Sequence, residues 1–154
     1  MEQKIIRTLN VYYYGMMALT LLAGTLAYFL IMKDYVQPID SLSPLGQAIQ
    51  YIVILDALVT IPLGLYLCKK QCAALSILEK EEEKLLGYQK AATLRIVLVS
   101  NTMVFAIAAF YLMGAYQSML WVAAVSAIGW YFTKPSERKM ELELQPQDPN
   151  QEQY

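Results

Sequence analysis

The sequence predicts an all-α, polytopic membrane protein whose four transmembrane helices form an up-down antiparallel bundle with both termini in the cytoplasm. Three observations predict this fold: a composition that is 57% hydrophobic, four long apolar segments, and positive charge that falls on one side of them. Only 16% of the residues are charged, against about 25% in an average soluble protein. A soluble helical bundle is the alternative, but it needs polar outward faces on every helix, and residues 16–32 have almost none.

The four apolar segments are each long enough, or nearly so, to cross the ~30 Å hydrocarbon core as a helix. They cover residues 11–32, 49–68, 96–113 and 115–132. A segment in lipid must pair its own backbone amides, so we expect helices throughout, Pro62 included. Lys4 and Arg7 before the first segment resemble the start of a signal peptide. That segment is longer than a signal peptide's ~7–15 apolar residues, so we interpret it as an uncleaved signal anchor.

Positive charge sets the expected orientation. If the four segments alternate in direction, eleven of the twelve Lys and Arg residues lie on the side of both termini, and only Lys33 lies opposite. The positive-inside rule assigns the charged side to the cytoplasm. An odd number of crossings would scatter these charges, so the bias also favours four. We therefore expect a multi-pass protein of the cell membrane, of the bacterial inner-membrane type.

The charges also divide the chain. We expect a cytoplasmic N-terminus over residues 1–10, a transmembrane domain over 11–132, and a polar, disordered cytoplasmic tail over 133–154. Within the domain, residues 69–95 form a cytoplasmic helical hairpin. On the other side, Ser43 is expected to cap the second helix and Pro44 to occupy its first position.

The hairpin is predicted from its lack of Pro and Gly before Gly87. We expect the second helix to continue to about Leu86, with Gly87 as its left-handed stop and the third helix starting near Lys90. Leucines follow one side of this extension and glutamates the other. Two readings stay open: the leucine side binds a partner protein or the bundle, or the hairpin is simply solvated.

The composition excludes several classes of function. The chain has no histidine, which removes the commonest haem and zinc ligand and the commonest general base. No nucleotide-binding, hydrolase or metalloprotease motif is present, and a net charge of −1 gives no reason to expect nucleic-acid binding. We expect no enzyme, no catalytic residue, no cofactor and no metal.

The two cysteines, Cys68 and Cys72, lie four residues apart. Two thiols without a histidine do not complete a zinc site in one chain, so we expect unreactive cysteines, with regulatory thiol chemistry or acylation as the alternative. The long side chain of Arg95 reaches the membrane interface and needs no partner within the membrane.

Two groups of polar residues inside the segments are candidate sites. Asp56 is the one acid in a segment, and Thr25 and Thr60 are expected beside it as a proton- or cation-responsive group or as a structural hydrogen bond. Ser100 and Asn101 are expected to form polar contacts between helices.

Two functions follow. The first is a non-enzymatic accessory or interaction subunit in the lipid bilayer, which binds itself or another membrane protein through the 69–95 hairpin. The second is a minimal transporter or channel component that uses Asp56.

Overall fold

The computed structural model describes residues 2–145, and within that range the chain forms five helices and no strand. The expectation of an all-α fold is confirmed. The helices are α1 (Glu2–Met32), α2 (Pro44–Ser76), α3 (Glu81–Leu112), α4 (Gln117–Phe132) and α5 (Glu137–Leu144). Three of them, α1, α2 and α3, are long and apolar enough to cross a membrane. The 16 residues of α4 span only ~24 Å.

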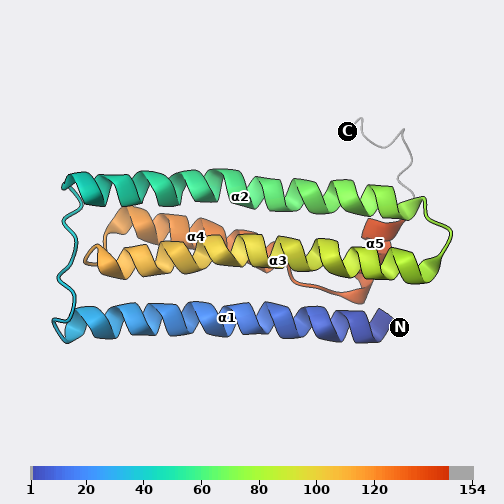
Figure 1. Cartoon of the computed structure of the whole chain (residues 1–154), viewed down its shortest axis with the longest axis horizontal. Coiled ribbons are helices and arrows are strands. Elements are labelled where there is room, and N and C mark those ends of the chain that lie inside the picture. Colours follow the sequence, from blue (N-terminus) through green and yellow to red (C-terminus); the bar gives the residue numbers. More distant parts are fainter. Residues whose placement is uncertain (1, 146–154) are drawn as a thin grey trace.

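The central helix of the molecule is α3. It lies between α1 and α2, which do not contact each other, and α4 packs behind α2 and α3 (Figure 1). Successive long helices run in opposite directions. The start of α1, the turn between α2 and α3, and α5 therefore gather at one end (Figure 1).

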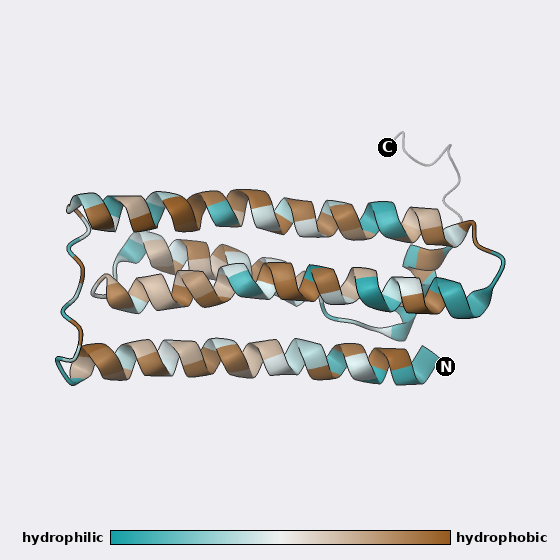
Figure 2. Ribbon diagram, in the orientation of Figure 1, coloured by the Kyte–Doolittle hydropathy of each residue, from teal (hydrophilic) through white to brown (hydrophobic). Residues whose placement is uncertain are grey.

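Polar and apolar residues are distributed unequally along the molecule. Hydrophilic residues concentrate at the end that carries the N-terminus, the α2–α3 turn and α5, whereas hydrophobic residues follow the helices away from it (Figure 2). Large apolar side chains lie on the outside of the long helices, including Leu22, Leu55 and Leu58, each more than 60% exposed. Apolar outward faces of this extent are typical of helices that contact lipid.

The start of α2 is as predicted. Ser43 is the N-cap and its hydroxyl accepts a hydrogen bond of 3.0 Å from the backbone N–H of Gly46, with Pro44 in the first turn. This contact satisfies one of the four N–H groups that a helix start leaves unpaired.

The predicted position of the hairpin turn is wrong. Helix α2 ends at Ser76 and α3 begins at Glu81, so Gly87 lies inside α3 and has no positive φ. Three glutamates, residues 81–83, occupy the first turn of α3, where negative charge stabilises a helix N-terminus. Gly87 serves a different purpose, because a Cβ there would lie 2.3 Å from Cδ2 of Leu75. The glycine lets α2 and α3 approach closely.

The two terminal segments contribute more structure than the sequence predicts. Helix α1 begins at Glu2, and Ile5, Ile6 and Leu9 are buried, so residues 2–10 pack with the other helices. The predicted disordered tail contains α5, whose Met140 is 1% exposed and Leu144 7% exposed. These side chains form one apolar core with α1, α2 and α3 at this end. The rest of the predicted tail, residues 146–154, lies outside the described residues.

Candidate functional site

Asp56 and Thr60 lie one turn apart on α2, as expected, and contact each other. The Thr60 hydroxyl donates a hydrogen bond of 2.8 Å to Oδ1 of Asp56. The other carboxylate oxygen, Oδ2, is buried and has no hydrogen-bond partner among the described residues. An unpaired carboxylate oxygen in a membrane helix costs free energy, because no water is available to form a hydrogen bond with it.

Thr25 does not join this pair. It lies on α1, which does not contact α2, and its hydroxyl donates to the backbone carbonyl of Leu21 at 2.7 Å. The expectation of a three-residue cluster is therefore wrong. It rested on equal depth along the helices, and depth alone does not say which helices are neighbours.

The predicted polar contacts of Ser100 and Asn101 are not found either. Ser100 is buried at 1% exposure and its hydroxyl has no hydrogen-bond partner among the described residues. Asn101, one residue further along α3, is exposed. Its side chain points away from the bundle, and no hydrogen bond joins it to another of the described helices.

Asn101 lies on the face of α3 that no other helix covers. Because α1 and α2 flank α3 and α4 packs behind it, a strip between the flanking helices stays open. Residues of this strip follow each other at alternating spacings of three and four, which keeps them on one side of a helix. We call them the α3 seam: Leu94, Val97, Asn101, Val104 and Ala108. The first three are exposed and the last two half-buried, and Phe105, which is 51% exposed, borders the seam beside Val104.

A second polar cluster, which the sequence did not indicate, lies at the charged end of the molecule. Arg95, in α3, is 4% exposed, and its Nη1 donates a hydrogen bond of 2.7 Å to Oε1 of Glu143 in α5. The Glu143 side chain is 24% exposed. Nε and Nη2 of Arg95 and Oε2 of Glu143 are buried without a hydrogen-bond partner among the described residues. Arg95 therefore has a charged partner in α5, which the sequence does not indicate.

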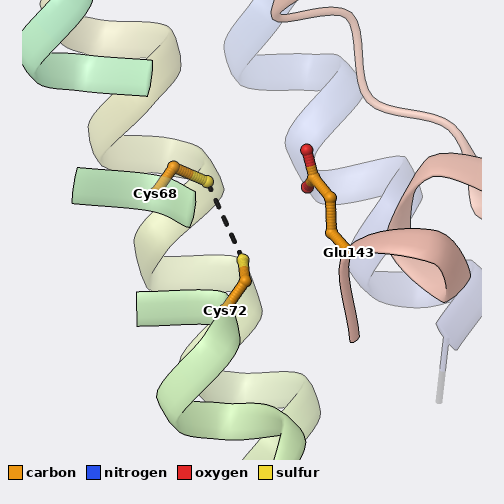
Figure 3. Close-up of side chains that lie close together, drawn as sticks. All are labelled: Cys68, Cys72 and Glu143. Atoms are coloured by element: carbon orange, nitrogen blue, oxygen red, sulfur yellow. Dashed lines mark hydrogen bonds between the residues drawn. The ribbon is translucent and has the colours of Figure 1, made fainter. Parts of the chain in front are cut away.

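The two cysteines belong to this cluster. Both are free, 2% exposed, and their sulfur atoms lie 3.9 Å apart on the side of α2 that faces Glu143 (Figure 3). The two sulfurs and a carboxylate oxygen of Glu143 all lie within 4.8 Å of one another. Two soft ligands and one hard ligand therefore converge from α2 and α5.

Positive charge borders the cluster on a second side. Lys139, half-buried in α5, donates a hydrogen bond to the backbone carbonyl of Phe132 at the end of α4. Burial and the neighbouring Arg95 guanidinium lower the pKa of Lys139. A cavity of about 490 Å³ reaches the cluster, and Cys72, Arg95 and Glu143 line it together with Lys139.

The contacts of this cluster that the sequence does not predict join residues far apart in the chain. Arg95 and Glu143 are 48 residues apart, and no local periodicity relates them. The sequence of the tail does contain a pattern that predicts α5. Ser136 is a typical N-cap residue, and Met140 and Leu144 after it share one helical face. The structure shows that Ser136 accepts a hydrogen bond from the backbone N–H of Lys139. Its cap and apolar pair indicate a short amphipathic helix.

Comparison with known proteins gave no further indication of function. No family model, no curated protein and no solved structure matches the chain.

Proposed function

We propose that the chain is a non-enzymatic interaction subunit of the cell membrane, and that it pairs with a second copy through the α3 seam. In this proposal four helices cross the bilayer of a bacterial inner membrane and both termini lie in the cytoplasm. The observation that carries the proposal is the exposure of Asn101 on the uncovered face of the central helix.

The charge distribution supports four crossings. The ends of the helices that carry eleven of the twelve positive residues gather at one end of the bundle (Figure 1), which the positive-inside rule assigns to the cytoplasm. The fourth crossing, α4, is short for a bilayer, and thinning of the bilayer or tilting of its neighbours accommodates such a helix at modest cost. Its Gly129 packs against Ile61 of α2 and Val99 of α3, so α4 lies beside helices that span.

A second copy is the occupant that fits Asn101 best. A carboxamide both donates and accepts hydrogen bonds, so it can pair with its own copy. Copies inserted in the same orientation are related by a twofold axis along the membrane normal. This axis brings the two α3 helices together in parallel, with Asn101 facing Asn101 at equal depth. Asparagine on a transmembrane interface favours association in this way.

The rest of the seam agrees with a parallel helix pair. Its three-and-four spacing is that of a left-handed coiled-coil seam, in which one polar residue among apolar ones fixes register and the number of chains. Ala108 permits close approach at the far end of the seam. The 69–95 hairpin, by contrast, leaves less apolar surface for a partner protein than expected, because Leu75 and Leu85 pack within the chain's own core.

Cross-linking in native membranes tests the proposal. In a Cys68→Ser, Cys72→Ser background, Asn101→Cys should form a disulfide-linked dimer under mild oxidation. Val59→Cys is the matched control, because Val59 is 52% exposed and lies on the outer side of α2. It should stay monomeric. Equal cross-linking at both positions, or none at Asn101→Cys, would reject pairing through the seam.

A second candidate function is transport of protons or cations through Asp56. The buried, unpaired Oδ2 favours it, because such an atom is available to a proton or an ion. In reconstituted vesicles Asp56→Asn should abolish flux while the fold is retained. Wild-type flux in this variant would leave Asp56 with a structural role only.

A further inference from the structure

We infer that Cys68, Cys72 and Glu143 form a binding site for one thiophilic divalent cation of the zinc class, at the end of the molecule where α2 meets α5. The site is independent of pairing through the α3 seam. It revises the expectation that two thiols without a histidine hold no metal, because no pattern along the sequence relates Glu143 to the two cysteines.

The spacing of the sulfurs fits zinc. In a tetrahedral site with Zn–S bonds of about 2.3 Å, two thiolates lie about 3.8 Å apart. The two sulfurs of the chain lie 3.9 Å apart. Because the cysteines are one helical turn apart on α2, their side chains share one side of the helix and reach a common point. A disulfide would require about 2.05 Å, so the thiols are separate groups that face the same point.

Glu143 supplies the third ligand. Its Oε1 accepts the hydrogen bond from Arg95, and its Oε2 is buried without a hydrogen-bond partner among the described residues. One of the carboxylate oxygens lies within 4.8 Å of both sulfurs. Metal-binding carboxylates are commonly held in this way, with one oxygen on the metal and the other on a neighbouring donor that fixes the orientation. Figure 3 shows the carboxylate of Glu143 directed to the same region as the two sulfurs.

Charge balance agrees with a divalent ion. Two thiolates and one carboxylate carry three negative charges, which a divalent cation and the bordering Arg95 and Lys139 offset. Binding releases both thiol protons to the solvent. The exchange of two protons for one divalent ion therefore leaves the net charge of the cluster unchanged.

The fourth position of a tetrahedral site is open. The cavity of about 490 Å³ lined by Cys72, Arg95 and Glu143 provides a route for the ion and room for water or an external ligand. Three protein ligands with one open position are the arrangement of exchangeable or catalytic zinc sites, whereas purely structural sites use four.

Metal titration of the full chain in detergent micelles tests the inference. With Zn²⁺ in competition with a chromophoric chelator, we expect one equivalent to bind per chain. With Co²⁺ we expect a thiolate-to-cobalt charge-transfer band. Cys72→Ser and Glu143→Gln should each weaken binding by more than the 10- to 100-fold that substitutions around a metal typically cost. Glu141→Gln, in the same helix, is the control and should bind as the wild type does.

The variants also separate metal binding from folding. Glu143→Gln removes the partner of Arg95, whereas Cys72→Ser keeps the ion pair, so loss of binding in Cys72→Ser at unchanged helix content points to the metal. Zn²⁺ should in addition protect both thiols of the wild type from alkylation. Binding of less than one equivalent by the wild type, or equal binding by Cys72→Ser, overturns the inference, and so does unchanged affinity in Glu143→Gln.

Discussion

Arg95 and Glu143, 48 residues apart in the chain, form an ion pair of 2.7 Å that fastens α5 to α3. The guanidinium is 4% exposed and the carboxylate 24%, so the pair is much less hydrated than an ordinary surface salt bridge. A short terminal helix with one charged anchor and two buried apolar side chains, Met140 and Leu144, is thereby held at the charged end of the bundle.

Removing one partner of this pair should destabilise the chain. Glu143→Gln leaves the Arg95 charge buried without its counterion, and we expect the free energy of unfolding to fall by about 3 kcal/mol, the lower end of the range for buried pairs, since Glu143 retains some solvent contact. Unfolding in mixed micelles measures the loss. Glu83→Gln is the control: it removes the exposed pair of Lys80 and Glu83 and one of the three negative charges in the first turn of α3, and should cost no more than about 1 kcal/mol. Equal losses in both variants would contradict a buried, energetically important pair.

A stacked aromatic pair joins α1 to α4. The rings of Tyr13 and Trp130 lie 4.1 Å apart at an angle of 11°, and Nε1 of Trp130 is buried without a partner among the described residues. Trp130→Phe keeps a ring but removes the unpaired N–H, so its stability should stay within about 1 kcal/mol of the wild type. Trp130→Ala should lose about 3 kcal/mol or more. Thermal unfolding of both variants checks the difference, and similar losses in the two would show that the indole N–H is paired.

Two glycines should respond to alanine in opposite directions. A Cβ on Gly46 would lie 2.1 Å from the backbone carbonyl oxygen of Asp40, which cannot move aside as a side chain can. Gly15, inside α1, has nothing within 4 Å of such an atom. We therefore expect Gly46→Ala to destabilise the chain and Gly15→Ala to stabilise it by up to about 1 kcal/mol. Denaturation midpoints compare the two, and a harmless Gly46→Ala would mean that the loop before α2 can shift.

The hydrogen bond from Thr60 to Asp56 should contribute little to stability. Thr60→Val removes the 2.8 Å contact while keeping the shape of the side chain, and hydrogen bonds between membrane side chains average about 0.6 kcal/mol. We expect a loss of about that size in a folding assay in bicelles. A loss above about 2 kcal/mol would indicate that Thr60 supports the carboxylate against a larger desolvation cost than this account assumes.

The features that the sequence predicts well are local ones. Apolar length predicts the three long helices, and Ser43 with Pro44 predicts the start of α2, because capping and hydrophobicity act within a few residues. The α2–α3 turn was misplaced since the chain from 77 to 80 contains neither Pro nor Gly. The glutamates at residues 81–83 stand at the start of α3, but in the sequence they look the same as a run of charged residues on a solvent-exposed helix face.

The features that the sequence does not predict depend on which helices are neighbours. Equal depth predicts Thr25 near Asp56, but α3 separates their helices. Asn101 is predicted to contact another helix, but the order of packing leaves its face of α3 open. The cluster of Arg95, Glu143 and the cysteines likewise exists only because α5 folds back onto α2 and α3. Which helices lie next to each other depends on how whole helices pack. The residue pattern of a single segment does not predict it.

Accessibility of the helix ends from each side of the membrane shows whether the chain crosses the bilayer four times. In a Cys68→Ser, Cys72→Ser background, single cysteines would be placed at exposed positions of the turns and of α5 and treated with a membrane-impermeant maleimide in right-side-out vesicles. Four crossings with cytoplasmic termini predict immediate labelling of Gln37→Cys and Gln117→Cys, and labelling of Glu79→Cys and Arg138→Cys only after permeabilisation. Labelling of all four positions in sealed vesicles, or of Gln117→Cys and Arg138→Cys from the same side, would contradict it.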